Sequence, residues 1–236
     1  MKRSLTVLTF VLLAMPAAQA ASLAPQETMP VFTWGVRAGF AANSTYVTNA
    51  FIDGHSIEEY QQDTQLGNFA ALQLRVNARR LFLQTGMGIS LNKSTFSIDR
   101  NSWNPESESA SEMELSYSLT SMTLPLQLGC HIINSSPYSM SVFTGPRFRI
   151  PFHDKYMTEF SGIAQEGWEE DITNIIPGWT LGLAIQIGRS FFDFEYEYGI
   201  RNISEGFHPV AAETPDPGII LNRRMGIMSF SFGIMF

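Results

Sequence analysis

The sequence has little charge, a single cysteine and an excess of acids over bases. Only 16% of its 236 residues are charged, and 15 Lys and Arg against 22 Asp and Glu give a net charge of −7. This balance excludes nucleic acid as the main partner, because phosphate binding requires a basic face. One cysteine excludes an internal disulfide framework and a multi-cysteine metal site. We expect no cofactor and no bound metal.

Beyond its first segment, the sequence has no apolar run of the roughly 20 residues that a membrane-spanning helix needs. Residues 1–20 instead have the pattern of a cleaved signal peptide. A basic start and an apolar run are followed by the small residues Ala18 and Ala20, at the positions that a signal peptidase reads. We expect cleavage before Ala21, so that the exported chain is a single domain over 21–236.

The exported part shows apolar residues at every second position, which is the period of a β-strand. In the segment 191–203, aromatic residues alternate with acids and small residues. A helix would scatter these aromatic residues around its axis, whereas a strand sorts them onto one face. Read in this way, the chain has eight segments: 31–43, 67–78, 81–92, 115–132, 138–150, 176–187, 191–203 and 222–236.

Short and long connections alternate strictly between these segments. The short ones are 79–80, 133–137 and 188–190, and the long ones are 44–66, 93–114, 151–175 and 204–221. Strands of this length cross a bilayer when tilted, and lipid requires a sheet without open edges. We therefore predict an all-β fold, a closed antiparallel eight-stranded up-and-down transmembrane β-barrel. An even strand number places both termini at the short-turn side, which is the periplasm in bacterial barrels.

The acids are concentrated in the long connections, which hold 18 of the 22. Three bases accompany them there, whereas the short turns contain Arg79, Arg80 and Arg189. We predict long acidic extracellular loops. A soluble eight-stranded barrel would need an apolar interior. Here the more polar stripe must face inward, because ionised groups are costly on the lipid face.

Charged residues fall at inward positions of several predicted strands. Eight strands enclose a lumen that side chains just fill, so these charges should pair. They form either a polar plug or, as the alternative, a small pore or channel whose pairs rearrange. The predicted lumen charge network is Arg37, Arg75, Arg147, Arg149, Asp193, Glu195, Glu197 and Arg201.

An outer-membrane lipid or peptide hydrolase would need a histidine beside a nucleophile or a water. No His-x-Ser pair places both residues on one strand face, and His131 has no evident partner. We expect no enzyme. The long connections also contain exposed aromatic candidates such as Trp103 and Trp168. These residues form a binding surface, or they pack between loops and at the lipid interface.

The last segment ends on an aromatic residue, and its alternating apolar stripe resembles the recognition signal of the outer-membrane assembly machinery. This assembly signal is Phe230, Phe232, Ile234 and Phe236. The chain as a whole resembles the PorT-like outer-membrane β-barrel family, whose members have the eight-stranded shape of OmpA and OmpX. The matching stretches are 35–39, 124–126, 137–138, 145–146, 191–202 and 222–236.

The resemblance implies a location in the outer membrane of a Gram-negative bacterium and, for some family members, a place in a type IX secretion assembly. We expect a structural or binding role exerted through the acidic loops. The expected partners are outer-membrane lipid, the barrel-assembly machinery during insertion, and an envelope protein bound by the loops.

Overall fold

The computed structural model describes residues 30–52, 55–56, 61–99, 112–153, 155–161, 168–209 and 220–236. Over these residues the chain consists of strands and their turns, and no helix there is long and apolar enough to cross a membrane. The predicted signal peptide, with Ala18, Ala20 and Ala21, lies outside the described residues.

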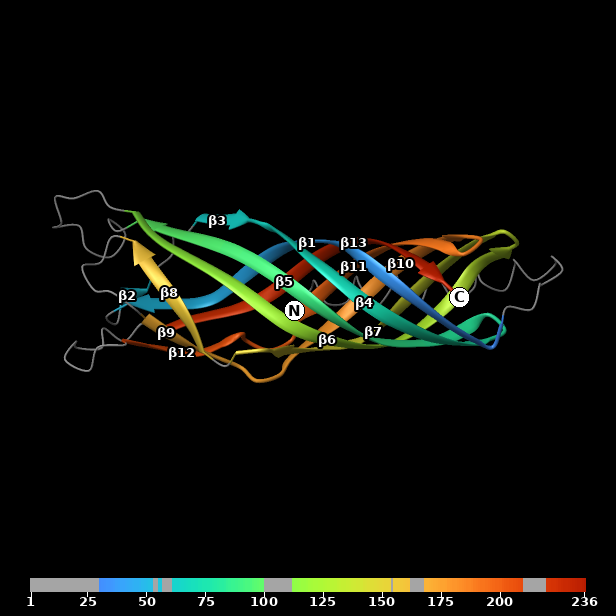
Figure 1. Ribbon diagram of the computed structural model, residues 1–236. Coiled ribbons are helices and arrows are strands. Elements are labelled where there is room, and N and C mark those ends of the chain that lie inside the picture. Colours follow the sequence, from blue (N-terminus) through green and yellow to red (C-terminus); the bar gives the residue numbers. More distant parts are fainter. Residues whose placement is uncertain are drawn as a thin grey trace, which may run out of the picture.

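Eight long strands form the barrel, each antiparallel to its neighbours in chain order (Figure 1). Their ring closes where the last strand pairs with the first, which confirms the predicted fold class. The strands are β1 (Phe32–Ile52), β4 (Leu66–Ala78), β5 (Leu81–Asp99), β6 (Glu112–Ser135), β7 (Tyr138–Pro151), β10 (Ile176–Ile187), β11 (Ser190–Gly199) and β13 (Ile220–Met235).

The closure between β1 and β13 runs over most of both strands. It begins at Gly35 opposite Met235 and continues to Phe51 opposite Ile220. Below it, Trp34 and Phe236 exchange two backbone hydrogen bonds, with N···O distances of 3.1 and 2.7 Å. The first and last strands therefore satisfy each other's backbone groups, as the interior of a bilayer requires.

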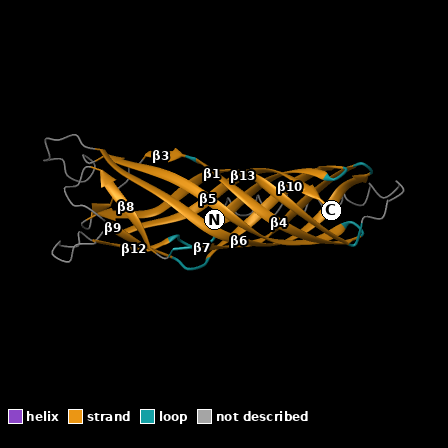
Figure 2. Cartoon of the chain, viewed as in Figure 1, coloured by secondary structure: helices purple, strands orange, loops and turns teal. Residues whose placement is uncertain are grey.

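Short additional strands lie at the end opposite the tight turns and the C-terminus, where Figure 1 labels them and Figure 2 shows them in the colour of strands. They are β2 (His55–Ser56), β3 (Gln61–Thr64), β8 (Lys155–Ser161), β9 (Trp168–Ile172) and β12 (Ser204–Pro209). The predicted long loops are thus partly strand. β1, β5 and β6 continue beyond their predicted ends, because a hydrogen-bonded ladder continues without the apolar alternation that lipid imposes, whereas β11 ends at Gly199, before its predicted end at 203.

The barrel is polar inside and apolar outside. Among the described residues, 23 buried side chains are polar or charged and 12 are hydrophobic, whereas large hydrophobic residues cover the outer wall. This is the reverse of a soluble core. It agrees with the predicted orientation of the two stripes.

An apolar layer fills the lumen near the tight turns. Three buried phenylalanine rings lie against glycines of neighbouring strands, where a Cβ atom would stand only 2.1 to 2.3 Å from the nearest ring carbon. The pairs are Phe82 with Gly129, Phe143 with Gly182, and Phe191 with Gly233. The absence of a side chain on each glycine thus provides the space for a ring across a narrow lumen.

Candidate functional site

Three strands contribute the charged groups at the centre of the lumen. β1 places Arg37 inward, β7 places Arg147 and Arg149 inward, and β11 contributes three carboxylates. The charged residues on β7 and on β11 are two positions apart, so the strand period places them on one face. All six residues are at least 93% buried.

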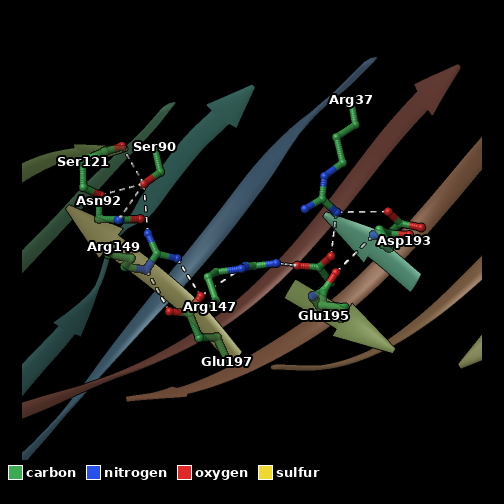
Figure 3. A network of polar contacts seen from close by, with 11 residues as sticks. Arg37, Ser90, Asn92, Ser121, Arg147, Arg149, Asp193, Glu195 and Glu197 are labelled. Atoms are coloured by element: carbon green, nitrogen blue, oxygen red, sulfur yellow. Dashed lines mark hydrogen bonds and ion pairs between the residues drawn. The ribbon is translucent and has the colours of Figure 1, made fainter. Parts of the chain in front are cut away.

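The first half of the network joins β1 to β11 and then to β7 (Figure 3). The NH1 group of Arg37 donates to Asp193 Oδ2 at 3.1 Å and to Glu195 Oε1 at 2.6 Å. Arg147 donates through NH2 to the other oxygen of Glu195 and through NH1 to Glu197 Oε2 at 3.1 Å. Glu195 therefore bridges two arginines from different strands.

The second half ends in a bidentate pair. Arg149 donates to Glu197 through Nε at 2.8 Å and through NH2 at 2.7 Å. Its NH1 group donates to Ser90 Oγ at 2.9 Å, and Ser90 lies 3.0 Å from the hydroxyl of Ser121 (Figure 3). Hydrogen bonds thus connect side chains from β11, β7, β5 and β6 across the lumen.

The charges of this network balance, with three arginines against three carboxylates. Little space remains beside it. A cavity of about 20 Å³, lined in part by Arg37, Arg149 and Asn92, has room for about one water molecule. The network therefore occupies the centre of the lumen in the described part of the chain.

Arg75 is buried as predicted but forms different contacts from those expected of an ion pair. Its Nε and NH2 groups donate to Gln84 Oε1 at 3.1 and 2.8 Å, and its guanidinium lies 4.2 Å from the centre of the Phe82 ring. Gln84 donates in turn to Gln127 at 3.1 Å. A neutral amide and an aromatic face thus stabilise this arginine.

The placement of Arg201 in the lumen was wrong, because the structure has this side chain exposed. β11 ends at Gly199, and the amide of Ile200 already bonds to the carbonyl of Pro177. The chain bends at Arg201, so the inward alternation of the strand no longer applies there.

Two buried polar residues differ from the prediction. Arg223 was not among the predicted lumen residues, yet it is fully buried on β13, and the alternation that faces Phe230 outward faces Arg223 inward. His131, expected to lack a partner, lies 3.4 Å from Asn77 Oδ1 through Nε2 and 3.2 Å from Ser139 Oγ through Nδ1. These three side chains are in the order of a nucleophile, a base and an orienting group, but all are buried, so the contact satisfies polar groups within the lumen.

The predicted assembly signal lies on the outer wall of β13. Phe230, Phe232, Ile234 and Phe236 are all exposed, and the ring of Phe236 stacks on Trp34 with 4.7 Å between centroids. The aromatic stripe therefore faces outward where β13 pairs with β1 to close the barrel.

A closed barrel with a charged interior and an apolar outer wall is the architecture of an integral outer-membrane protein. A family model described as an outer membrane protein beta-barrel domain matches residues 18–205. The chain belongs to this family, and its location is the outer membrane. Among curated proteins, none matches the chain in sequence.

Solved outer-membrane protein structures that are similar to the chain have low sequence identity to it. The outer membrane protein OprG from Pseudomonas aeruginosa is 12% identical, with a TM-score of 0.51 over 86% of this chain and 95% of OprG. The outer membrane protease OmpT from Escherichia coli is 8% identical, with a TM-score of 0.44 over 89% of this chain and 99% of OmpT. Neisserial surface protein A is 10% identical, with a TM-score of 0.42 over 89% of this chain and its own full length. The likeness to OprG supports the fold alone.

Proposed function

We propose that the protein is a non-conducting outer-membrane frame that presents acidic strands and loops for binding. The observation that supports a non-conducting barrel is the buried network from Arg37 to Arg149. Every ion pair in it joins different strands, so an ion path would require several buried pairs to separate together. Removing one partner from a buried pair costs about 3–5 kcal/mol.

Conductance tests this part of the proposal. The purified barrel in a planar lipid bilayer should show no steady single-channel steps, because the network and the phenylalanine layer fill the lumen. Steps in the unmodified protein that change with Glu195→Ala or Arg147→Ala would contradict the plug. Arg189→Ala removes an exposed charge at a tight turn and serves as the control.

The binding role is supported by the structure of the barrel end opposite the tight turns and the C-terminus. Strands β1, β5 and β6 continue there beyond the length of about 9 to 11 residues that crosses a bilayer. β8, β9 and β12 add a hydrogen-bonded extension that joins the barrel through the pairing of β8 with β6. With the termini in the periplasm, this acidic end faces the outside of the cell, where loops on a rigid frame commonly bind partners.

A partner with a basic surface would complement these segments. The acidic run on β9, Glu169, Glu170 and Asp171, provides the test. An envelope partner that co-purifies from native membranes in mild detergent should be lost from a Glu169→Gln, Glu170→Gln, Asp171→Asn variant. A lone species from the unmodified protein, or a partner retained by the variant, would count against binding through these acids.

The PorT-like resemblance supports a narrower version of this role, a place in a type IX secretion assembly. The exposed stripe that ends at Phe236 supports recognition by the barrel-assembly machinery during insertion. In neither role do we assign the barrel an enzymatic activity.

A further inference from the structure

A group of polar and basic side chains lies on the outer wall at the rim opposite the tight turns and the C-terminus. Arg224 on β13 is opposite Tyr46 on β1, and paired residues of antiparallel strands face the same side. Tyr46 is exposed on the outer wall, so Arg224 is on that wall as well. The Nε group of Arg224 donates to Asn202 Oδ1 at 3.4 Å, and Arg201 beside Asn202 is exposed.

Tyrosine hydroxyls border this group on the side of the membrane. The ring of Tyr46 lies over Gly226, where a Cβ atom would be only 2.5 Å from the ring. The missing side chain lets Tyr46 extend across β13, and its hydroxyl lies 3.3 Å from that of Tyr196 on β11. Tyr198, on the same outer stripe of β11, is 46% exposed.

The apolar wall of the barrel begins directly below these tyrosines. Met228 and Phe230 continue the outer stripe of β13, and they are 50% and 53% exposed. Tyrosine is enriched where hydrocarbon meets the lipid headgroups. The rim cluster, which we define as Tyr46, Tyr196, Arg201, Asn202 and Arg224, thus lies at the level of the headgroups.

We propose that the rim cluster binds the phosphate of a lipid whose headgroup is anionic. Guanidinium groups donate several hydrogen bonds in a plane that matches phosphate geometry, and neighbouring hydroxyls can add further donors. The bond from Arg224 to Asn202 uses Nε and leaves both terminal nitrogens outside that contact. The cluster is therefore a set of donors at the depth where lipid phosphates lie.

The charge of the chain favours a lipid as the source of the phosphate. The long segments beyond this rim hold 18 of the 22 acids, which repel anions approaching from solution. A lipid phosphate reaches the rim along the membrane surface and is kept there by its acyl chains against the apolar wall. This site is on the outside of the barrel and does not depend on the plug or on the binding role of the acidic segments.

Lipid binding to the folded protein tests the site. The protein in mild detergent is titrated with phosphatidylglycerol, and bound lipids are counted by native mass spectrometry. Removing a basic residue beside an anionic membrane surface weakens attraction by roughly fivefold. We expect Arg224→Gln to weaken binding by about fivefold and the Arg201→Gln, Arg224→Gln variant by about 25-fold.

The matched control is a Lys93→Gln, Arg189→Gln variant. Like the double arginine variant, it loses two positive charges, but from exposed positions away from the cluster. Lys93 is at the same rim, and Arg189 is in a tight turn at the opposite rim. It should bind phosphatidylglycerol as the unmodified protein does, and all variants should keep the different gel mobilities of unheated and boiled barrel. Equal losses in the control would overturn the site. So would unchanged binding by the double arginine variant, equal affinity for phosphatidylcholine, or displacement of the lipid by equimolar inorganic phosphate.

Discussion

Replacing Glu195 with alanine is expected to destabilise the folded barrel by about 3–5 kcal/mol, the cost of removing one partner from a buried ion pair. Glu195 is 1% exposed and accepts from both Arg37 and Arg147, so its removal leaves two buried guanidinium groups with fewer acceptors. Water that enters the vacated space can accept hydrogen bonds but does not supply the negative charge that the two guanidinium groups lose. Urea-induced unfolding of the protein in lipid vesicles, followed by gel mobility, measures the change.

A second substitution separates lost pairing from lost packing. Replacing Arg37 and Arg147 with methionine and Asp193 with asparagine in the Glu195→Ala variant removes the uncompensated charges, including that of Asp193, which pairs with Arg37, while keeping most of the side-chain volume. This quadruple variant retains the pair of Arg149 with Glu197 and should regain much of the lost stability, because neutral groups can replace a whole set of buried ion pairs with little net cost. If Glu195→Ala alone changes the urea midpoint no more than Arg189→Gln at an exposed turn, the network does not stabilise the barrel.

The fold could be predicted because contact with lipid imposes a simple period-two pattern of apolar residues on the sequence. Each outward side chain must be apolar where it meets acyl chains, so the strand period is visible at Phe192, Phe194 and their neighbours. Beyond the bilayer this requirement ends. The continuation of β1 to Ile52 and the strands β8, β9 and β12 depend on backbone pairing, which has no such signature.

The members of the lumen network followed from the same alternation, but their pairing did not. Arg37 and Glu195 are 158 positions apart, and their contact depends on the order of strands around the ring and on the register between them. Arg201 shows the limit of the pattern, because alternation holds only while the strand lasts. His131 shows another limit, since its partners Asn77 and Ser139 come from two other strands.

The inner and outer faces of the barrel wall tolerate charge for different reasons, in the lumen and at the outer rim. Inside, side chains of opposite sign neutralise one another, so the barrel can bury six ionised groups where lipid cannot reach them. Outside, Arg224 lies just beyond the apolar band, where a charge can meet headgroups and water. The same strand period therefore produces a filled lumen and a basic position at the rim.

Introducing valine at Gly182 is expected to destabilise the barrel about as much as Glu195→Ala does, because an aromatic ring already occupies the space beside this glycine. A Cβ atom at this position would stand 2.3 Å from two carbons of Phe143, which is 2% exposed. The ring is confined in the lumen beside Phe82 and Ala184, so it has little room to move. We expect a loss of about 3 kcal/mol or more, at the upper end of the range for overpacking.

A compensating change tests whether this loss comes from the ring. In the Gly182→Val, Phe143→Ala variant the new methyl groups occupy part of the space that the ring vacates, so the double variant should be more stable than Gly182→Val. Phe143→Ala alone should cost about 3–5 kcal/mol through the cavity that it leaves. If the two losses simply add in urea unfolding, the glycine and the phenylalanine are independent, and the fit of ring to glycine does not determine how this end of the lumen is filled.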